Sequence, residues 1–441
     1  MRIVIIGAVA AGTSAATEIR RNDKEAEIII YEKDKYISYA GCGMPFYISN
    51  ETESFSSLVP RDPGFFKEKH NIDIYTEHEV ESVNPENKTL MVKNARGKLM
   101  DRYDKLIIAT GAYSVKPDLQ GADRDNVFSL RNINDMIKIK NYMEEKKPRS
   151  AAIVGSGSIG LEMCESFKFS GLDVAIIARS KISKGIDDKL SLYIEDHLRE
   201  KGVNVYTGTK TAEINDQGLV LEDGRLVKAD MVLLATGAKP NVTLAKNMGV
   251  QIGITGAIKV DKHMKTNIDD VYSCGDCIEM YSAINGAPVY KPLGSTANKT
   301  GTIAGSNITG IKKEFKGILG TVIFRVFDLT VGMTGFSEEE AIKSGYDVVT
   351  STDMRANKPE YMGGRPIIIK AVAEKETGRL LGAQMVGYEG VDRRLDVFAA
   401  AITFGAKAED LMDLDLAYAP PYSTPRDPLY YTGVKLKAKQ I

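Results

Sequence analysis

The chain has 441 residues, enough for roughly two to four domains with a large buried core. Its hydrophobic content of 43%, charged content of 27% and net charge of −1 are typical of a soluble globular enzyme and argue against a nucleic-acid binder, which would carry a basic stripe. Four cysteines are too few for a disulfide framework, no apolar run approaches the ~18 residues of a membrane span, and the four histidines lack metal-ligand spacing, so we expect a cytoplasmic protein without a metal site.

The N-terminal stretch predicts a dinucleotide-binding β–glycine loop–α–β unit. Gly7 permits a tight turn, Gly12 permits close packing of helix on strand, and the helix N-terminus can hold a pyrophosphate while Glu32 binds an adenosine ribose hydroxyl. The middle glycine of the usual pattern is Val9, so an ordinary parallel-sheet turn is the alternative. Strand, helix and strand are expected at Arg2–Ile6, Thr13–Asn22 and Glu27–Tyr31.

The same unit recurs with a complete G-x-G-x-x-G loop formed by Gly155, Gly157 and Gly160. Strands are expected at Ser150–Val154 and Asp173–Ile177, with a helix between them that ends near Ser170. Two such units in one chain are a far more specific sign of dinucleotide binding than one unit alone. They indicate an enzyme with one bound and one exchanging dinucleotide.

The choice of nicotinamide coenzyme is predicted by the residues after the second strand. Ala178 replaces the carboxylate that would bind a ribose 2′-hydroxyl, and Arg179 and Lys181 offer cations for a 2′-phosphate. We expect NADPH to be accepted, with NADH as well left open. The alternative is that both cations are solvated surface charges.

Two short apolar strands end in the same Ala-Thr-Gly turn, one at Ala109, Thr110 and Gly111 and the other closing at Gly237. A further strand ends in Gly275-Asp276, at the edge of an α/β sheet where ligands bind. From about Gly320 strands alternate with helices in a pattern typical of a separate α+β domain. In that domain Ser337 is expected to cap a helix that begins with three glutamates.

The stretch from Ser38 to Tyr47 holds one cysteine, Cys42, between two glycines and just before a helix start at Pro45. A thiol at a helix N-terminus is favoured as the reactive thiolate. We therefore expect Cys42 to be a redox nucleophile, the alternative being a buried structural thiol. For the other cysteines we expect packing roles, including the C-x-x-C pair Cys274 and Cys277.

Taken together, these features resemble the pyridine nucleotide–disulfide oxidoreductases over essentially the whole chain. The resemblance implies an α/β fold of two Rossmann-like domains and a C-terminal α+β dimerisation domain. An FAD-binding domain is expected at 1–112 and 241–319, an NAD(P)H-binding domain at 113–240 and the dimerisation domain at 320–441. It further implies a homodimer that uses FAD with NADPH, NADH or both.

Tyr47 stands where the two-cysteine branch of the family has its second redox cysteine. The chain is therefore similar to the single-cysteine branch of coenzyme A-disulfide reductases, NADH oxidases and peroxidases, and NAD(P)H polysulfide reductases. The first glycine loop lacks the histidine typical of the oxidases and peroxidases. The segments around Tyr361 and Tyr418 are similar to coenzyme A-disulfide reductase, in which two tyrosines of the partner subunit approach the active-site cysteine.

The resemblance implies that FAD receives hydride from NAD(P)H and passes two electrons to Cys42, which attacks a disulfide or persulfide sulfur while Tyr361 and Tyr418 donate a hydrogen bond or proton. Coenzyme A bound to Cys42 is a further expectation. Contacts to coenzyme A are expected from Arg21, Ser38, Asn298 and Arg426. Cofactor contacts are expected from Gly7, Ala11, Gly12, Glu32, Lys33, Ala109, Thr110, Gly111, Arg131, Gly155, Gly157, Ile159, Gly160, Arg179, Gly237, Gly275 and Asp276.

Three positions differ from the best-known coenzyme A-disulfide reductases: Glu18, Gly41 and Asn298 stand in place of glutamine, asparagine and histidine. The acceptor therefore stays open among coenzyme A disulfide, its persulfide, polysulfide and oxygen. An NAD(P)H oxidase that uses Cys42 as a sulfenic acid is the nearest alternative. A redox module acting on a protein partner is a more distant one.

Overall fold

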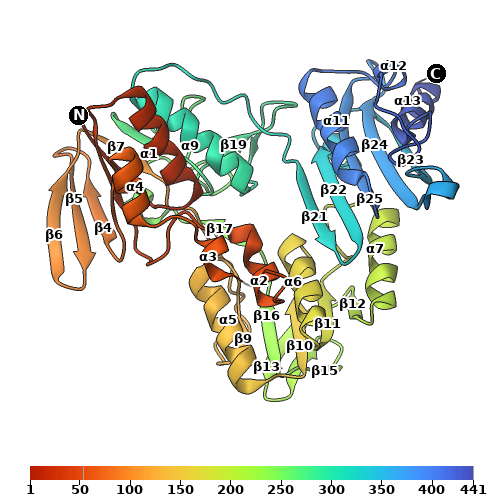
Figure 1. Ribbon diagram of the computed structural model, residues 1–441, viewed down its shortest axis with the longest axis horizontal. Helices are drawn as coiled ribbons and strands as arrows, with labels where there is room; N and C mark the ends of the chain where they lie inside the picture. The colour runs from red at the N-terminus through yellow and green to blue at the C-terminus, as the bar shows by residue number, and fades with distance from the viewer. Residues whose placement is uncertain (53, 441) are drawn as a thin grey trace. The chain divides into compact units, whose positions relative to one another are not determined.

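The computed structural model describes residues 1–52 and 54–440. The chain divides into two compact units, drawn in Figure 1. The first contains Met1–Val115, Arg131–Lys138 and Gly237–Ile318. The second contains Lys116–Leu130, Ile139–Thr236 and the chain from Leu319 onward. The division into three domains at 113, 241 and 320 stays a prediction.

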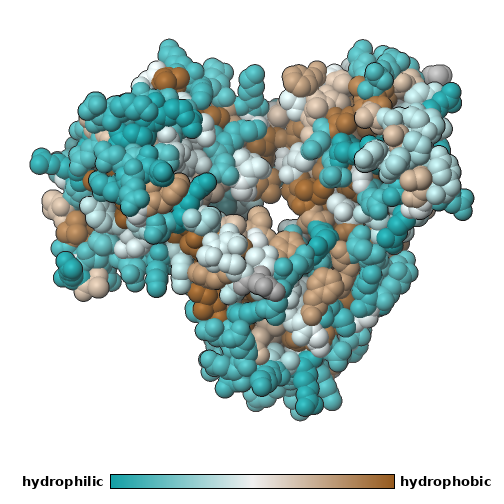
Figure 2. All heavy atoms as spheres, viewed as in Figure 1, coloured by the Kyte–Doolittle hydropathy of each residue, from teal (hydrophilic) through white to brown (hydrophobic). Residues whose placement is uncertain are grey.

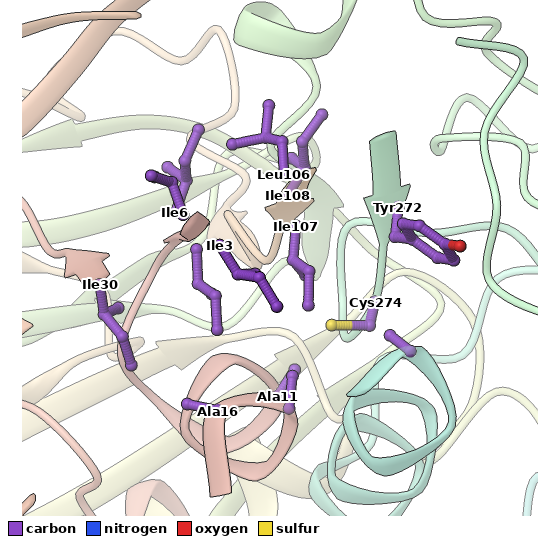
Figure 3. Packing of buried hydrophobic residues seen from close by; sticks show 14 of the residues in the cluster. Ile3, Ile6, Ala11, Ala16, Ile30, Leu106, Ile107, Ile108, Tyr272 and Cys274 are labelled. Carbon is purple, nitrogen blue, oxygen red and sulfur yellow. The ribbon is translucent and has the colours of Figure 1, made fainter. Parts of the chain in front are cut away.

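The first unit is built on a five-stranded parallel sheet with the order β18-β7-β1-β2-β3. Its strands are β1 (Arg2–Ile6), β2 (Glu27–Tyr31), β3 (Asp73–Tyr75), β7 (Lys105–Ile108) and β18 (Val271–Ser273). Strands buried on both faces are typical of parallel sheets, which explains their continuous apolar sequences. Helix α1 (Ala10–Asn22) covers the sheet, and Figure 3 shows Ile3 and Ile107 pointing toward its small residues Ala11 and Ala16.

The rest of the first unit consists of further helices and small antiparallel sheets. Its other helices are η1 (Gly41–Gly43), α2 (Met44–Ile48), α3 (Phe55–Leu58), α4 (Pro63–His70), α8 (Thr243–Asn247) and α9 (Gly294–Ile308), and α9 packs along α1. An antiparallel sheet is formed by β4 (Glu79–Asn84), β5 (Thr89–Asn94) and β6 (Gly97–Arg102). Two-stranded ladders pair β8 (Ala112–Ser114) with β17 (Ala238–Pro240), and β19 (Met280–Tyr281) with β20 (Pro288–Val289).

The second unit repeats this architecture. Its five-stranded parallel sheet has the order β12-β11-β10-β16-β9. The strands are β9 (Val127–Phe128), β10 (Ser150–Val154), β11 (Asp173–Ala178), β12 (Asn204–Thr207) and β16 (Met231–Leu234). An antiparallel sheet of β13 (Thr211–Asn215), β14 (Gly218–Leu221) and β15 (Leu226–Lys228) again precedes the strand that ends in Ala-Thr-Gly. The helices are α6 (Ser158–Phe169) and α7 (Asp188–Glu200), while α5 (Ile133–Lys146) runs through both units.

The C-terminal part of the second unit is a five-stranded antiparallel sheet with helices, as expected for an α+β domain. Its strands are β21 (Val322–Val326), β22 (Leu329–Gly335), β23 (Val348–Ala356), β24 (Pro366–Glu374) and β25 (Leu380–Gly387). Its helices are α10 (Glu338–Lys343), η2 (Glu360–Met362), α11 (Val391–Thr403), α12 (Asp410–Asp413) and α13 (Pro428–Ala438). The predicted cap of α10 is confirmed, because Ser337 and Glu340 form a reciprocal capping box.

The predicted fold class of two Rossmann-like units and a C-terminal α+β domain is confirmed by these sheets. One predicted helix start was wrong by three residues. Helix α1 begins at Ala10 rather than Thr13, directly after the glycine-loop residue Val9. In the C-terminal sheet, Phe327 follows β21 with a left-handed φ of 57° in the turn into β22.

Candidate active site

In the first glycine loop, backbone carbonyl groups lie so close to Gly7 and Gly12 that neither position has room for a side chain. Gly7 follows β1 with φ of 107°, and a Cβ there would lie 2.3 Å from the Ala109 carbonyl oxygen. A Cβ at Gly12 would lie 1.9 Å from the carbonyl oxygen of Gly7. The loop therefore requires glycine at both positions, as the sequence predicted.

A buried carboxylate lies at the end of β2. Glu32 accepts a hydrogen bond from the backbone nitrogen of Ala8 at 2.8 Å and another from that of Asp34 at 2.9 Å. Burial raises its pKa, although these two hydrogen bonds favour the ionised form. Each carboxylate oxygen can still accept a further hydrogen bond, so Glu32 fits the predicted contact to a ribose hydroxyl. The exposed Lys33 follows directly.

A second carboxylate lies beyond β18, where Gly275 turns the chain with φ of 82°. Asp276 Oδ2 pairs with the guanidinium of Arg131 at 2.6 Å, and Arg131 Nε also donates to the Ala112 carbonyl at 3.0 Å. Asp276 Oδ1 is buried and has no hydrogen-bond partner among the described residues. A carboxyl oxygen buried without a hydrogen-bond donor is costly, so Oδ1 indicates a ligand hydroxyl at this point. These residues fit the predicted FAD site.

The Ala-Thr-Gly turn after β7 is fixed by a hydrogen bond of its own. Thr110 Oγ1 donates to the Asn241 carbonyl at 2.7 Å. Gly111 has φ of 66°, and a Cβ added there would have no atom within 4 Å, so its backbone faces open space. In the corresponding second turn, the Gly237 carbonyl accepts a hydrogen bond from the backbone nitrogen of Val115 at 2.8 Å.

The second glycine loop repeats the geometry of the first. Gly155 has φ of 112°, and a Cβ there would lie 2.2 Å from the Ala235 carbonyl oxygen. A Cβ at Gly160 would lie 2.1 Å from the Gly155 carbonyl oxygen. Gly157 has open space around it, and the neighbouring Ile159 is 37% exposed. This loop can therefore receive a dinucleotide along its backbone.

The two candidate 2′-phosphate cations differ in their surroundings. Ala178 is buried at the end of β11, and Arg179 is exposed without an ion pair to any described residue. Lys181 instead pairs with Asp188 at 2.5 Å. Of the two, Arg179 is therefore the better candidate for a 2′-phosphate contact.

Cys42 lies in the η1 turn immediately before α2 and is exposed. Its segment is attached to the first glycine loop, because the backbone nitrogen of Ser38 donates to the Ala8 carbonyl at 2.9 Å. The other three cysteines are fully buried, and burial raises the pKa of Cys164 to about 12. The packing roles predicted for Cys164, Cys274 and Cys277 agree with this burial. Cys42 is thus the thiol accessible from solvent.

One face of α1 gathers polar side chains opposite α9. Ser14, Glu18 and Arg21 follow each other at helical spacing, and Ser14 Oγ donates to Asn298 Oδ1 at 2.8 Å. The buried carboxylate of Glu18 pairs with Arg21 and accepts from Lys313 Nζ at 3.0 Å. The structure therefore brings Asn298 to the helix that carries Arg21. Ser14 and Lys313 were missed from the sequence, although the spacing of Ser14, Glu18 and Arg21 was a visible signal for the first.

Tyr361, Tyr418 and Arg426 lie in the second unit. Tyr361 belongs to η2 and is 76% exposed, while Tyr418 is 49% exposed. The guanidinium of Arg426 lies 5.3 Å from the ring centre of Tyr430. The roles of these three residues stay predictions.

Polar and charged residues cover most of the face shown in Figure 2, with apolar residues in separate patches. None of the described helices combines the length and hydropathy needed to cross a bilayer. Across residues 1–52 and 54–440, no group of three or more His, Cys, Asp or Glu side chains could hold a metal ion.

Comparisons with known proteins agree with this geometry. The NAD(P)H sulfur oxidoreductase (CoA-dependent) of Pyrococcus furiosus is 39% identical over 99% of both chains. The coenzyme A disulfide reductase of Staphylococcus epidermidis is 32% identical over 98% of this chain and 99% of that protein. The solved structure of an NAD-dependent persulfide reductase from A. fulgidus matches with a TM-score of 0.97 at 37% identity, covering 100% of this chain and 84% of the other.

Two family models match as well. The model of pyridine nucleotide-disulphide oxidoreductases matches residues 1–296, and that of their dimerisation domain matches residues 321–427. Both matches coincide with the sheets described above, the parallel pair and the C-terminal antiparallel one. The chain therefore belongs to the pyridine nucleotide-disulphide oxidoreductase family, whose members use FAD and NAD(P)H and dimerise through the last domain.

Proposed function

We propose that this protein reduces coenzyme A disulfide, or a related low-molecular-weight disulfide or persulfide, with electrons from NAD(P)H. The observation that carries the proposal is the contrast among the four thiols. Cys42 is exposed beside the first glycine loop, whereas Cys164, Cys274 and Cys277 are buried. The sulfur with which Cys42 exchanges must therefore come from outside the chain.

When bound, FAD accepts a hydride from NAD(P)H and makes the electron pair available for sulfur reduction. The protein's part is to bind and orient. Glu32 would hold the adenosine ribose and Asp276 Oδ1 would accept from a cofactor hydroxyl, while the ion pair with Arg131 holds the Asp276 carboxylate in place.

The chemistry at Cys42 is thiol–disulfide exchange. The Cys42 thiolate bonds to one sulfur of the external disulfide, and the other sulfur leaves as a thiolate that takes up a proton. The electron pair from NAD(P)H then cleaves the mixed disulfide, which regenerates the Cys42 thiolate and releases the second sulfur as a thiolate that takes up a proton. With a persulfide substrate the same steps release sulfide. The exposure of Cys42 supports both versions.

Coenzyme A carries phosphates, and cations with fixed positions suit it. Arg21 contacts the phosphates, while Ser38 and Asn298 contact polar atoms of the same ligand. The hydrogen bond from Ser14 to Asn298 and the ion pair of Arg21 with Glu18 support this assignment, because they hold both side chains at one face of α1.

Residues of the dimerisation domain complete the site in trans. Tyr361 of the partner subunit and Tyr418 of the partner subunit donate a hydrogen bond or proton to the leaving thiolate, and Arg426 of the partner subunit contacts coenzyme A. The exposure of these side chains on the single chain, and the match to a dimerisation domain, support a role across subunits.

Two measurements test the function. Cys42→Ser should abolish NAD(P)H-dependent thiol release from coenzyme A disulfide while FAD content stays unchanged. The matched control Cys164→Ala removes a buried thiol and should keep turnover. If Cys42→Ser kept full disulfide reduction, Cys42 would not be the attacking sulfur and the proposal would be wrong.

The acceptor is identified by the mass added to Cys42 in the purified protein. Coenzyme A or one extra sulfur supports a disulfide or a persulfide substrate respectively, as in the relatives named for those activities. Oxygen on Cys42, together with oxygen uptake that exceeds thiol release, would contradict the proposal in favour of an oxidase.

A further inference from the structure

A buried ion pair lies beneath the exposed loops of the C-terminal domain. Arg394 on α11 is 1% exposed, and it donates to Asp427 through Nε to Oδ1 at 2.9 Å and through an Nη to Oδ2 at 2.8 Å. Further bonds run to the Asn357 carbonyl at 3.0 Å and to Ser423 Oγ at 3.3 Å. Ser423 Oγ donates in turn to Asp427 Oδ2 at 2.7 Å. Arg394 thereby joins two segments far apart in the sequence.

The first of these segments carries Tyr361. The loop is closed at its base by Asn357, whose backbone nitrogen donates to the Arg365 carbonyl at 2.9 Å and whose Oδ1 accepts from the Arg365 backbone nitrogen at 2.8 Å. Within the loop a Cβ at Gly364 would lie 2.0 Å from the Lys358 carbonyl oxygen, so the backbone is tightly folded. The carbonyl of Asn357 that Arg394 binds is therefore the anchor of the Tyr361 loop.

The second segment carries Tyr418 and Arg426. A turn follows Tyr418 directly, because the backbone nitrogens of Tyr422 and Ser423 both donate to the Ala419 carbonyl, at 2.9 and 3.1 Å. This turn ends at Ser423, which the ion pair binds. Arg426 immediately precedes Asp427, which also caps α13 by accepting from the Leu429 backbone nitrogen at 3.0 Å.

No polar contact with a described residue fixes the side chain of either tyrosine. Neither hydroxyl group has a hydrogen bond to any described residue, and both side chains are largely exposed on the single chain. Their positions therefore depend on how the two loops are anchored. A buried, bidentate pair is suited to fix one arrangement, because every alternative leaves a charge buried without its partner.

We propose that the Arg394–Asp427 pair is the positioning device that holds the Tyr361 loop and the Tyr418 segment in register for disulfide reduction. This inference rests on the proposed function of the two tyrosines. In this role Arg394 touches neither substrate nor cofactor, and it acts through the backbones of the two loops.

The test compares two neighbouring arginines. Arg394→Lys keeps a positive charge but loses the second nitrogen that reaches Asn357 and Ser423. Arg393 binds the same Asp427 oxygen at 2.9 Å but does not hydrogen-bond Asn357 or Ser423, so Arg393→Gln is the matched control. We expect Arg394→Lys to lower kcat for coenzyme A disulfide at least tenfold, with KM for NADPH and ferricyanide reduction unchanged. Arg393→Gln should stay within twofold of the parent in all three.

A double-mutant comparison separates positioning from a general structural effect. In the Tyr361→Phe/Tyr418→Phe background, Arg394→Lys should lower disulfide turnover less than twofold further, because the groups it positions are gone. If the loss of disulfide turnover from Arg394→Lys were as large in the double tyrosine variant as in the parent, the inference would be overturned. An Arg394→Lys enzyme with unchanged kcat would also overturn it.

Amide hydrogen exchange tests the positioning without activity. Faster exchange in 357–365 and 414–427 of Arg394→Lys, with β24 unchanged, supports the inference, and unchanged exchange in both segments contradicts it. If Tyr361→Phe/Tyr418→Phe keeps full disulfide turnover, the proposed role of the tyrosines fails instead. The exchange measurement then still decides whether Arg394 anchors the loops.

Discussion

The two glycine loops share one backbone design. A side chain on Gly7 would meet the Ala109 carbonyl at 2.3 Å, and one on Gly155 would meet the Ala235 carbonyl at 2.2 Å. In both units the loop lies against the Ala-Thr-Gly turn at the end of the neighbouring strand. A sequence without glycine at these positions could not bring the helix N-terminus to the sheet edge, where the dinucleotide binds.

The surroundings of the two loops differ. The first is lined by carboxylates held in place inside the protein, Glu32 between two backbone nitrogens and Asp276 against Arg131. Beside the second loop, β11 ends at the small Ala178, and the exposed Arg179 follows it. Buried, preorganised contacts suit a cofactor that stays bound, and an exposed flexible cation suits one that exchanges. The difference thus separates the predicted FAD site from the predicted NAD(P)H site.

The largest effect is expected from adding one methyl group to each loop. Gly7→Ala combines a left-handed φ, which costs about 1–3 kcal/mol in strain, with a backbone clash of similar cost. We expect Gly7→Ala to be isolated without FAD. Gly155→Ala should keep FAD and lower the rate of flavin reduction by NAD(P)H at least tenfold. Flavin absorbance and stopped-flow reduction measure the two outcomes.

Gly185→Ala is the control for these substitutions, since Gly185 has open space around it and an ordinary φ. It should change neither measurement. Loss of FAD from both Gly7→Ala and Gly155→Ala would show that the loops are not assigned to different cofactors.

A smaller effect is expected at the coenzyme-selecting cation. Arg179→Ala should raise KM for NADPH about 10- to 100-fold, the equivalent of one charge-assisted hydrogen bond, and change KM for NADH less than threefold. Lys181→Ala should have a weaker effect, because Lys181 is already paired with Asp188. Steady-state kinetics with both coenzymes measure this. A parent enzyme that strongly prefers NADH would remove the basis for the prediction.

The parallel sheets could be predicted because their signal is local. Ile3–Ile6 and Ile28–Tyr31 are unbroken apolar runs, each preceded by one charged residue, and the structure has strands with the predicted bounds, Arg2–Ile6 and Glu27–Tyr31. The antiparallel sheet β4-β5-β6 was missed. Its strand Gly97–Arg102 is mostly exposed and largely polar, so no apolar run marks it. A half-exposed strand is stabilised by its neighbours, which a single sequence does not show.

Candidate site residues could be predicted where the local geometry or chemistry requires one residue type. They could not be predicted where a residue depends on an ion-pair partner from a distant part of the chain. Glycines, the terminal carboxylates and Cys42 follow from turn geometry and chemistry. By contrast, the pair of Arg131 with Asp276 joins positions 145 residues apart, and the burial of Arg394 depends on Asp427 from another segment. A charged residue in a helix is expected to be exposed until the tertiary fold supplies its counter-ion.

The helices after the two loops carry glutamates whose pKa values shift in opposite directions, the buried Glu18 on α1 and the half-buried Glu162 on α6. Burial alone would raise the pKa of Glu18, but hydrogen bonds from Ser306 and Lys313 hold it below its usual value. Burial, reinforced by Glu165, raises the pKa of Glu162 on α6 to about 7. The two carboxyl groups should therefore affect stability with opposite dependence on pH.

Between its ordinary pKa of 4.5 and about 7, the Glu162 carboxyl holds a proton only in the folded chain, so its contribution to stability is lost as pH rises across this window. Glu162→Gln should be about 1–2 kcal/mol more stable than the parent at pH 8 and equal to it near pH 4.5. Glu18 contributes above pH 4.5 and loses that contribution as pH falls through its lowered pKa. Glu18→Gln should therefore lower Tm at pH 8, and stabilisation of both variants at pH 8 would contradict the assignment.

The smallest effect is expected from Val9→Gly, which gives the first loop the full pattern of the second. Val9 has φ of −95°, in the range open to any residue, and its carbonyl already accepts from Thr13. Glycine at this position raises the conformational entropy of the unfolded chain, and the loop gains little in return because Val9 is not strained. The free energy of unfolding should therefore fall by about 0.5–1 kcal/mol. Bound FAD should stay at one per chain, as measured by absorbance after dialysis. In such loops the backbone nitrogens, and not the side chain, face the pyrophosphate. A loss of FAD would therefore mean that the Val9 side chain itself packs on the cofactor. Gly157, the corresponding residue of the second loop, has no side chain to make such a contact.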